Sequence, residues 1–84
     1  MSAITVYWAT GCHLCEPALT TARAVGARIG VPVIDVDISG DAALERRYRT
    51  AIPVVELDGR RLAKYFVDEA DLETRVRRRL AALD

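Results

Sequence analysis

The chain has 84 residues, of which 51% are hydrophobic, and its 12 Lys and Arg side chains balance its 12 Asp and Glu side chains. This length predicts one domain over residues 1–84, and the zero net charge gives no general attraction to nucleic acid or to an anionic membrane. Because no apolar run approaches the roughly 18–20 residues that cross a bilayer, and no basic segment precedes an apolar stretch at the N-terminus, we expect a cytoplasmic protein.

The first two predicted elements are a buried strand and an amphipathic helix. Residues 3–9 (AITVYWA) are apolar on both faces and rich in β-branched and aromatic side chains, which is typical of a central strand in an α/β sheet. Thr10 and Gly11 break this strand. Apolar side chains then recur at helical spacing over residues 15–29, and Gly30 closes the predicted helix.

The next two predicted elements are a strand and a short helix. Residues 31–38 (VPVIDVDI) alternate apolar and acidic side chains, which predicts a strand. Pro32 suits an edge strand or the start of a strand, because it has no backbone N–H to donate. Residues 41–48 predict a helix that places Leu44 and Tyr48 on one face.

A hairpin and a final helix complete the chain. Residues 53–57 are strand-like, and Asp58-Gly59 is a strong turn signal that leads into a strand over residues 60–65. Asp68 is a good N-cap for the last helix. The apolar side chains of that helix recur at helical spacing and are Leu72, Val76, Leu80 and Leu83.

The order β-α-β-α-β-β-α restricts the fold class. The early βαβ unit must pair its strands in parallel with a right-handed crossover, whereas the later hairpin must be antiparallel. An α/β fold with one mixed four-stranded sheet and helices on both faces accommodates both units. No linker, internal repeat or low-complexity segment interrupts the chain.

The two cysteines, Cys12 and Cys15, fall at the turn between the first strand and the first helix. The first N–H groups of a helix lack intrahelical acceptors and carry partial positive charge, so they stabilise a thiolate at Cys12. Such placement lowers a thiol pKa from about 8.5 to roughly 3.5–7.5. Cys15 lies one turn further into the helix and should be less exposed. We therefore expect Cys12 to attack a disulfide and Cys15 to resolve the mixed disulfide.

Two neighbours of the cysteines carry opposing charges. A protonated His13 would favour the thiolate of Cys12, whereas Glu16 disfavours a second thiolate, so we expect a moderate redox potential. The alternative reading of His13 is a solvated loop residue.

The cysteine pair also has readings other than redox catalysis. Zinc takes four ligands, and beyond the cysteines the nearby chain offers only His13, so we expect no metal and no bound cofactor in a single chain. A metal or iron–sulfur cluster bridging two chains is one alternative, and a binding module with redox-inactive cysteines is another.

The densest basic run lies near the end of the chain. It lies toward the C-terminal end of the last predicted helix, and four acids lie at the start of the same helix. This distribution of charge complements the helix dipole without any partner. We therefore expect no nucleic-acid and no membrane partner. The run comprises Arg75, Arg77, Arg78 and Arg79.

Two segments resemble a known superfamily. Residues 7–15 (YWATGCHLC) resemble the strand–turn–helix signature of thioredoxins and glutaredoxins, and residues 51–55 (AIPVV) resemble the segment that carries their cis-proline. The order of elements also matches over nearly the whole chain. In length and in its His-Leu dipeptide the sequence is similar to the small bacterial glutaredoxin-like family.

This resemblance implies a thioredoxin/glutaredoxin fold and a thiol–disulfide oxidoreductase. Cys12 matches the nucleophile, Cys15 the resolving thiol and Pro53 the cis-proline that faces them. Ile52 matches the residue whose backbone pairs with an incoming substrate strand. His13, together with Leu14 and Trp8, is a further candidate for substrate contact, although for Trp8 a packing role is favoured over that contact.

The sequence departs from the relatives at positions that decide the reductant. Ala9 stands where glutathione-using glutaredoxins carry Lys, and Ala63-Lys64 stands in place of their Gly-Gly pair. Val6 stands where thioredoxins bury a carboxylate. A low-molecular-weight thiol and an NADPH-dependent flavoprotein reductase therefore both stay open as the source of electrons. The expected substrate is a disulfide-containing protein or a mixed disulfide, and we expect a monomer.

Overall fold

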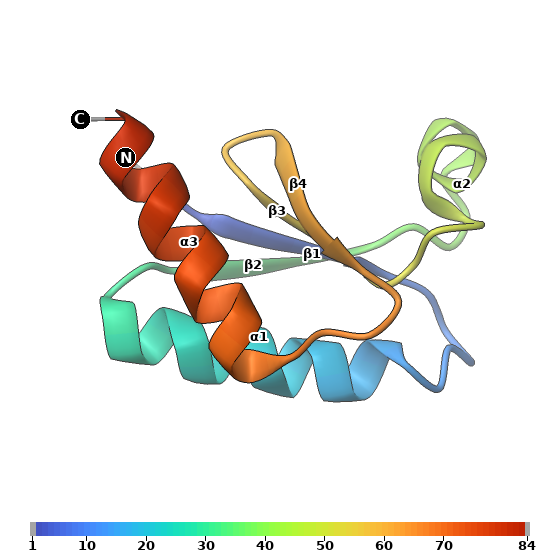
Figure 1. Cartoon of the computed structure of the whole chain (residues 1–84). Helices are drawn as coiled ribbons and strands as arrows, with labels where there is room; N and C mark the ends of the chain where they lie inside the picture. Colours follow the sequence, from blue (N-terminus) through green and yellow to red (C-terminus); the bar gives the residue numbers. More distant parts are fainter. Residues whose placement is uncertain (1, 84) are drawn as a thin grey trace.

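Seven elements follow each other in the predicted order in the computed structural model, which describes residues 2–83 (Figure 1). Each observed boundary lies within two residues of the predicted one. No helix of the described residues is long and apolar enough to cross a membrane. The elements are β1 (Ile4–Trp8), α1 (Cys15–Ile29), β2 (Val33–Asp37), α2 (Ala42–Tyr48), β3 (Val54–Leu57), β4 (Arg60–Lys64) and α3 (Glu69–Leu83).

The strands form one four-stranded sheet in the order β2-β1-β3-β4, and its mixed parallel and antiparallel pairing confirms the prediction. β1 pairs in parallel with β2, placing Ile4 opposite Val33, and antiparallel with β3, placing Val6 opposite Val55. β3 and β4 form the predicted hairpin, with positive φ angles of 50° at Asp58 and 84° at Gly59. The apolar first strand is therefore central, and the strand after Pro32 lies at an edge.

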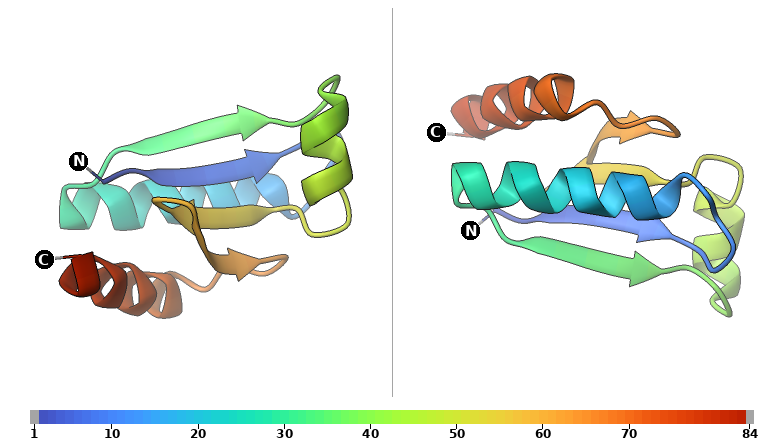
Figure 2. Two further views of the ribbon diagram at one scale, coloured as in Figure 1. Left: turned by 90° about the horizontal axis from the view of Figure 1, so that it is seen from above. Right: turned by 90° about the horizontal axis from the view of Figure 1, so that it is seen from below.

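Helices cover both faces of the sheet unequally (Figure 2). α1 and α3 lie side by side on one face, where Arg28 of α1 pairs with Glu69 and Glu73 of α3. α2 lies at the end of the sheet where β1 and β2 finish (Figure 1). The buried residues between the sheet and the two long helices are Ile4, Val6, Ala22, Val25, Val55, Leu57, Leu62, Leu72 and Val76.

Gly30 and Asp68 have the roles that the sequence predicts at the helix ends. Gly30 ends α1 in a left-handed conformation with φ 86° and donates its N–H to the Gly26 carbonyl. The side chain of Asp41 accepts from the Leu44 N–H at 3.1 Å, and that of Asp68 accepts from the Asp71 N–H at 2.9 Å. Both aspartates therefore cap their helices. The side chain of Leu83 lies outside the described part.

α2 covers a second, smaller apolar cluster. Tyr48 is buried there with Ile38 and Val54, and its ring stacks on that of Tyr7 with the centroids 4.0 Å apart. The Tyr48 hydroxyl donates to the carboxyl group of Glu56, which is itself 6% exposed. This cluster holds α2 and the loop that follows it against the end of β1.

Gly26 of α1 lies where the helix meets the start of β2. A Cβ atom there would stand 2.6 Å from the Val31 carbonyl oxygen and 2.7 Å from Cγ2 of Val33. We predict that Gly26→Ala lowers the free energy of unfolding by about 1–2 kcal/mol, because overpacking outweighs the gain in helix propensity. Urea unfolding measures this. Ala27→Gly, at the next, exposed position, is the matched control and should cost about 0.5–1 kcal/mol. An increase in stability for Gly26→Ala would contradict the steric account.

Candidate active site

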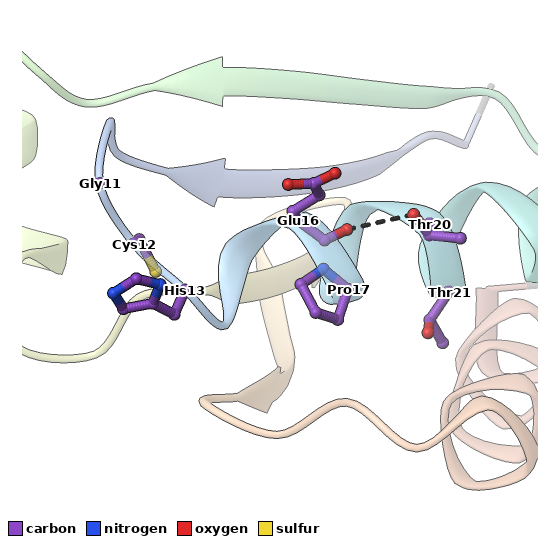
Figure 3. Close-up of a pocket in the computed structure, with 7 residues that line it drawn as sticks. All are labelled: Gly11, Cys12, His13, Glu16, Pro17, Thr20 and Thr21. Carbon is purple, nitrogen blue, oxygen red and sulfur yellow. Dashed lines mark hydrogen bonds between the residues drawn. The ribbon is translucent and has the colours of Figure 1, made fainter.

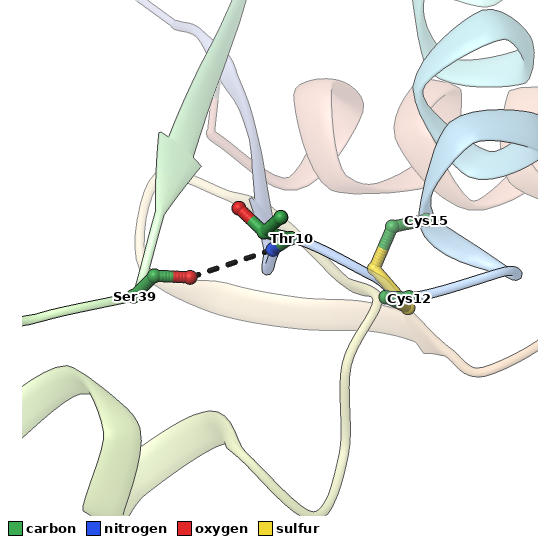
Figure 4. Close-up of a disulfide and its surroundings, with 4 residues drawn as sticks. All are labelled: Thr10, Cys12, Cys15 and Ser39. Atoms are coloured by element: carbon green, nitrogen blue, oxygen red, sulfur yellow. Dashed lines mark hydrogen bonds between the residues drawn. A yellow bond between two sulfur atoms is a disulfide. The ribbon is translucent and has the colours of Figure 1, made fainter.

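The turn between β1 and α1 is fixed by its own backbone. The Cys12 N–H donates to the Ala9 carbonyl at 3.3 Å, and the Cys15 N–H donates to the Cys12 carbonyl at 3.3 Å. Gly11 lies between these bonds with φ 83°, a left-handed conformation that favours glycine. The Thr10 N–H donates to the Ser39 hydroxyl at 3.4 Å, which ties the turn to the segment after β2 (Figure 4).

Cys12 and Cys15 form a disulfide, with their Cα atoms 5.4 Å apart (Figure 4). Cys15 is only 2% exposed, whereas Cys12 is intermediate in exposure. The predicted difference in burial is thus confirmed. The pair is in its oxidised form, and an attacking thiol can reach the sulfur of Cys12 more readily than that of Cys15.

The N-terminus of α1 provides the electrostatic setting of Cys12. Leu14 occupies the N-cap with a helical backbone, and its side chain makes no capping hydrogen bond. Pro17 has no N–H, and the Ala18 N–H donates to the Leu14 carbonyl at 3.2 Å. The positive end of the helix dipole therefore faces the cysteine turn without a side-chain acceptor at the cap.

An open hollow of about 710 Å³ lies beside Cys12 (Figure 3). His13 and Glu16 line it and are exposed, so an imidazole and a carboxyl group border the space beside Cys12. The Thr20 hydroxyl donates to the Glu16 carbonyl at 3.2 Å and holds the wall of the hollow. The other lining residues are Gly11, Pro17 and Thr21.

The structure gives Trp8 a structural contact. Its indole Nε1 donates to Asp35 of β2 at 3.1 Å, and Asp35 also pairs with Arg23 of α1 at 3.7 Å. Trp8 does not line the hollow beside Cys12. Its side chain joins β1, β2 and α1 on the side away from β3.

The Ile52–Pro53 peptide bond is cis, as the resemblance implies. Pro53 is buried, and its carbonyl accepts from the Tyr65 N–H at 2.9 Å. The Ile52 N–H donates to the Tyr48 carbonyl at 3.0 Å, at the end of α2. Main-chain pairing of Ile52 with a substrate strand would therefore use its carbonyl oxygen.

Two aromatic side chains that the sequence did not single out lie near the site. Tyr65, expected at the end of the fourth strand, has φ 64° and so ends β4 at Lys64. Phe66 is 81% exposed. Together with Leu14 and Pro17, both aromatics line a separate hollow of about 310 Å³. The sequence signal for them is an apolar run between the last strand and the Asp68 cap. This run fits neither the alternation of a strand nor the spacing of a helix.

Among residues 2–83, no group of three or more His, Cys, Asp or Glu side chains could hold a metal ion.

Comparison with solved structures places this geometry among thioredoxin folds. The X-ray structure of target protein XcR50 from X. campestris is 29% identical, with 90% of this chain and 97% of that chain covered and a TM-score of 0.76. Protein Ne2328 from Nitrosomonas europaea is 27% identical, with coverages of 87% and 88% and a TM-score of 0.72. Thioredoxin 1 from Thermosipho africanus shares the fold, with 13% identity, coverages of 96% and 97% and a TM-score of 0.69.

No curated protein matches the sequence significantly. A sequence profile of the glutaredoxin-like domain (DUF836) matches residues 3–77, which include β1 to β4, the cysteine turn and the first half of α3. The thioredoxin fold and the Cys12–Cys15 disulfide agree with that match. The chain belongs to the glutaredoxin-like domain family.

Proposed function

We propose that this protein is a thiol–disulfide oxidoreductase that reduces disulfides with the Cys12–Cys15 pair. The observation that carries the proposal is the asymmetric pair itself: a disulfide at the N-terminus of α1 with a reachable Cys12 and a buried Cys15. This asymmetry separates an attacking thiol from a resolving thiol, which is what disulfide exchange requires.

The proposed reaction starts from the reduced pair. The Cys12 thiolate attacks one sulfur of the substrate disulfide, forms a mixed disulfide and releases the first substrate thiolate, which takes up a proton. The Cys15 thiol then loses its proton to solvent, and its thiolate attacks the Cys12 sulfur. The Cys12–Cys15 disulfide forms and the second substrate thiolate leaves. Two electrons pass from the protein to the substrate, and two thiols from a reductant restore the pair.

The source of those electrons is a low-molecular-weight thiol or an NADPH-dependent protein reductase. Ala9 and the pair Ala63-Lys64 replace residues with which glutaredoxins hold glutathione. The two sources are separated by assaying turnover with glutathione, glutathione reductase and NADPH against turnover with thioredoxin reductase and NADPH. Either source requires a reducing compartment such as the cytoplasm.

A thiol titration tests the proposed function directly. The reduced protein should lose two thiols rapidly to DTNB, and dithiothreitol should restore them. Turnover of a protein disulfide in one of the two coupled assays should accompany this reactivity. Slow or absent thiol reactivity would instead indicate a binding module, and bound metal or colour in the purified protein would indicate a metal or cluster carrier.

We predict a redox potential of roughly −200 to −270 mV for the cysteine pair. His13 and Glu16 border the hollow and have opposite effects on a thiolate, which a protonated imidazole favours and a carboxylate disfavours. Val6 stands where thioredoxins bury a carboxylate. No single neighbour therefore drives the pair strongly toward either redox state. Equilibration against glutathione or dithiothreitol measures the potential. A value near −120 mV would indicate an oxidant and contradict the role of electron donor.

A further inference from the structure

A second set of hollows lies away from the cysteines, between β4 and α3. One of about 400 Å³ and one of about 290 Å³ share Arg61, Leu62 and Arg75, so they adjoin each other and are together called here the basic groove. Among residues 2–83, a single carboxylate lines it, that of Asp71. The cations that line it are Arg60, Arg61, Lys64, Arg75, Arg78 and Arg79.

The acids of α3 neutralise only one arginine of the basic groove. Glu69 and Glu73 turn to α1, where Arg28 pairs with both, and Glu73 also pairs with Arg77 at 3.1 Å. Asp71 pairs with Arg75 at 2.8 Å. Within the described part of the chain, no carboxylate pairs with the four arginines that remain. These are Arg60, Arg61, Arg78 and Arg79.

One of these arginines has an unsatisfied polar atom. Nε of Arg79 is buried and has no hydrogen-bond partner among the residues that the structure describes. A buried donor without an acceptor destabilises the protein, so such atoms usually have an acceptor from water or from a ligand. Guanidinium groups bind carboxylates and phosphates best, because their donors match two oxygens at once.

The basic groove is joined to the cysteine site by apolar surface. Phe66 lines both the groove and the hollow of about 310 Å³ that Leu14 and Tyr65 border. Pro17 lines that apolar hollow and also the hollow beside Cys12. A track of adjoining hollows therefore leads from the disulfide, past Pro17 and Phe66, to the basic groove.

We propose that the basic groove binds an acidic, extended segment of the protein whose disulfide Cys12 reduces. This proposal rests on the proposed function and names its substrate class. Charge complementarity selects the acidic segment, and the exposed ring of Phe66 takes an apolar side chain between that segment and the disulfide. The track favours a protein over a nucleic acid as the bound molecule, because it begins at Cys12, where the substrate must supply a disulfide. The described chain is 35 Å long, so about ten extended residues reach any point of the groove.

Two matched peptides test the proposal. Each carries one cysteine in a mixed disulfide with thionitrobenzoate, followed by a leucine and a tail of about ten residues. The tail is rich in Glu and Ser in the acidic peptide and in Gln and Ser in the neutral peptide. Stopped-flow absorbance follows release of the coloured thiol by the reduced protein. At low salt the acidic peptide should react about tenfold faster, and high salt should remove the difference.

Charge-reversal variants locate the effect. Arg60→Glu on β4 and Arg78→Glu on α3 should each remove most of the advantage of the acidic peptide and leave the rate of the neutral peptide unchanged. Arg46→Glu, at an exposed position of α2 outside the groove, changes the net charge equally and should keep the advantage. The two groove variants lie on different elements, so a folding defect in one leaves the other as a test.

A cysteine-free acidic peptide separates failure of the groove from failure of the chemistry. Its binding, measured by fluorescence anisotropy, needs no thiol. If this peptide binds but the protein reduces no disulfide in the other assays, the proposed function is overturned and the groove is retained. Equal rates for both reactive peptides, or an equal loss in Arg46→Glu, would overturn the groove proposal. Stronger binding of a single-stranded oligonucleotide of equal charge would assign the groove to nucleic acid and overturn it as well.

Discussion

Replacing Cys12 with serine should abolish disulfide exchange, whereas replacing Cys15 with serine should trap a mixed disulfide between Cys12 and the substrate. Cys12 lies at the positive end of α1 and is partly exposed, so its thiolate is both stabilised and reachable. Cys15 is buried and acts only after the mixed disulfide has brought its target sulfur close. Without Cys15 the second step lacks its nucleophile, and the first intermediate accumulates.

Incubation of each reduced variant with a protein disulfide, followed by non-reducing electrophoresis, measures this outcome. Cys15→Ser should give a band of combined mass that dithiothreitol removes, and Cys12→Ser should give none. The rate of exchange should fall by at least about a thousandfold in Cys12→Ser, because the attacking group is lost. A trapped complex in Cys12→Ser, with an inert Cys15→Ser, would reverse the two roles.

The positions of the helices and strands could be predicted because their signals are local. Gly30 ends α1 and Asp68 starts α3 through their own backbone and side-chain preferences, which depend on few neighbours. The cysteine turn was predictable for the same reason, since Cys12 and Cys15 fall between a strand signal and a helix signal. Local signals also gave the order of elements, and handedness rules then allowed few topologies.

The features that escaped prediction depend on contacts between distant segments. Glu56 of β3 is buried and accepts from the hydroxyl of Tyr48 of α2, a contact that the pattern of β3 alone does not indicate. The arginines of α3 read as balanced by the acids of the same helix. Two of those acids also pair with Arg28 of α1, which no pattern within α3 reveals. Tertiary packing decides both cases.

Replacing Tyr48 with phenylalanine should lower the free energy of unfolding by about 2–4 kcal/mol at neutral pH, because the buried carboxyl group of Glu56 loses the hydroxyl that donates to it at 3.0 Å. Such a loss lowers the melting temperature of a domain this small by about 4–8 °C for each kcal/mol. Tyr65→Phe is the matched control. It removes a hydroxyl that donates to the Thr50 carbonyl at 2.7 Å in an exposed position, and it should cost at most about 1 kcal/mol.

The same substitution should change the response to alkaline pH. Burial raises the pKa of Tyr48 above its ordinary value, and the contacts with Tyr7 and Glu56 raise it further. Above about pH 10 the unfolded chain releases the phenolic proton while the folded chain keeps it, so stability falls as pH rises, by at most about 1.4 kcal/mol per unit from this group.

Because Tyr48→Phe lacks that proton, its stability deficit against the unsubstituted protein should narrow above about pH 10. Urea unfolding at pH 7 and at pH 11 measures the deficit at both values. Tyr48→Phe combined with Glu56→Leu should recover much of the loss, since removing both polar partners leaves no buried group without a hydrogen bond. A deficit for Tyr48→Phe equal to that of Tyr65→Phe at neutral pH, constant up to pH 11, would show that Glu56 does not depend on Tyr48. The tyrosine would then stabilise α2 through the packing of its ring on Tyr7 alone.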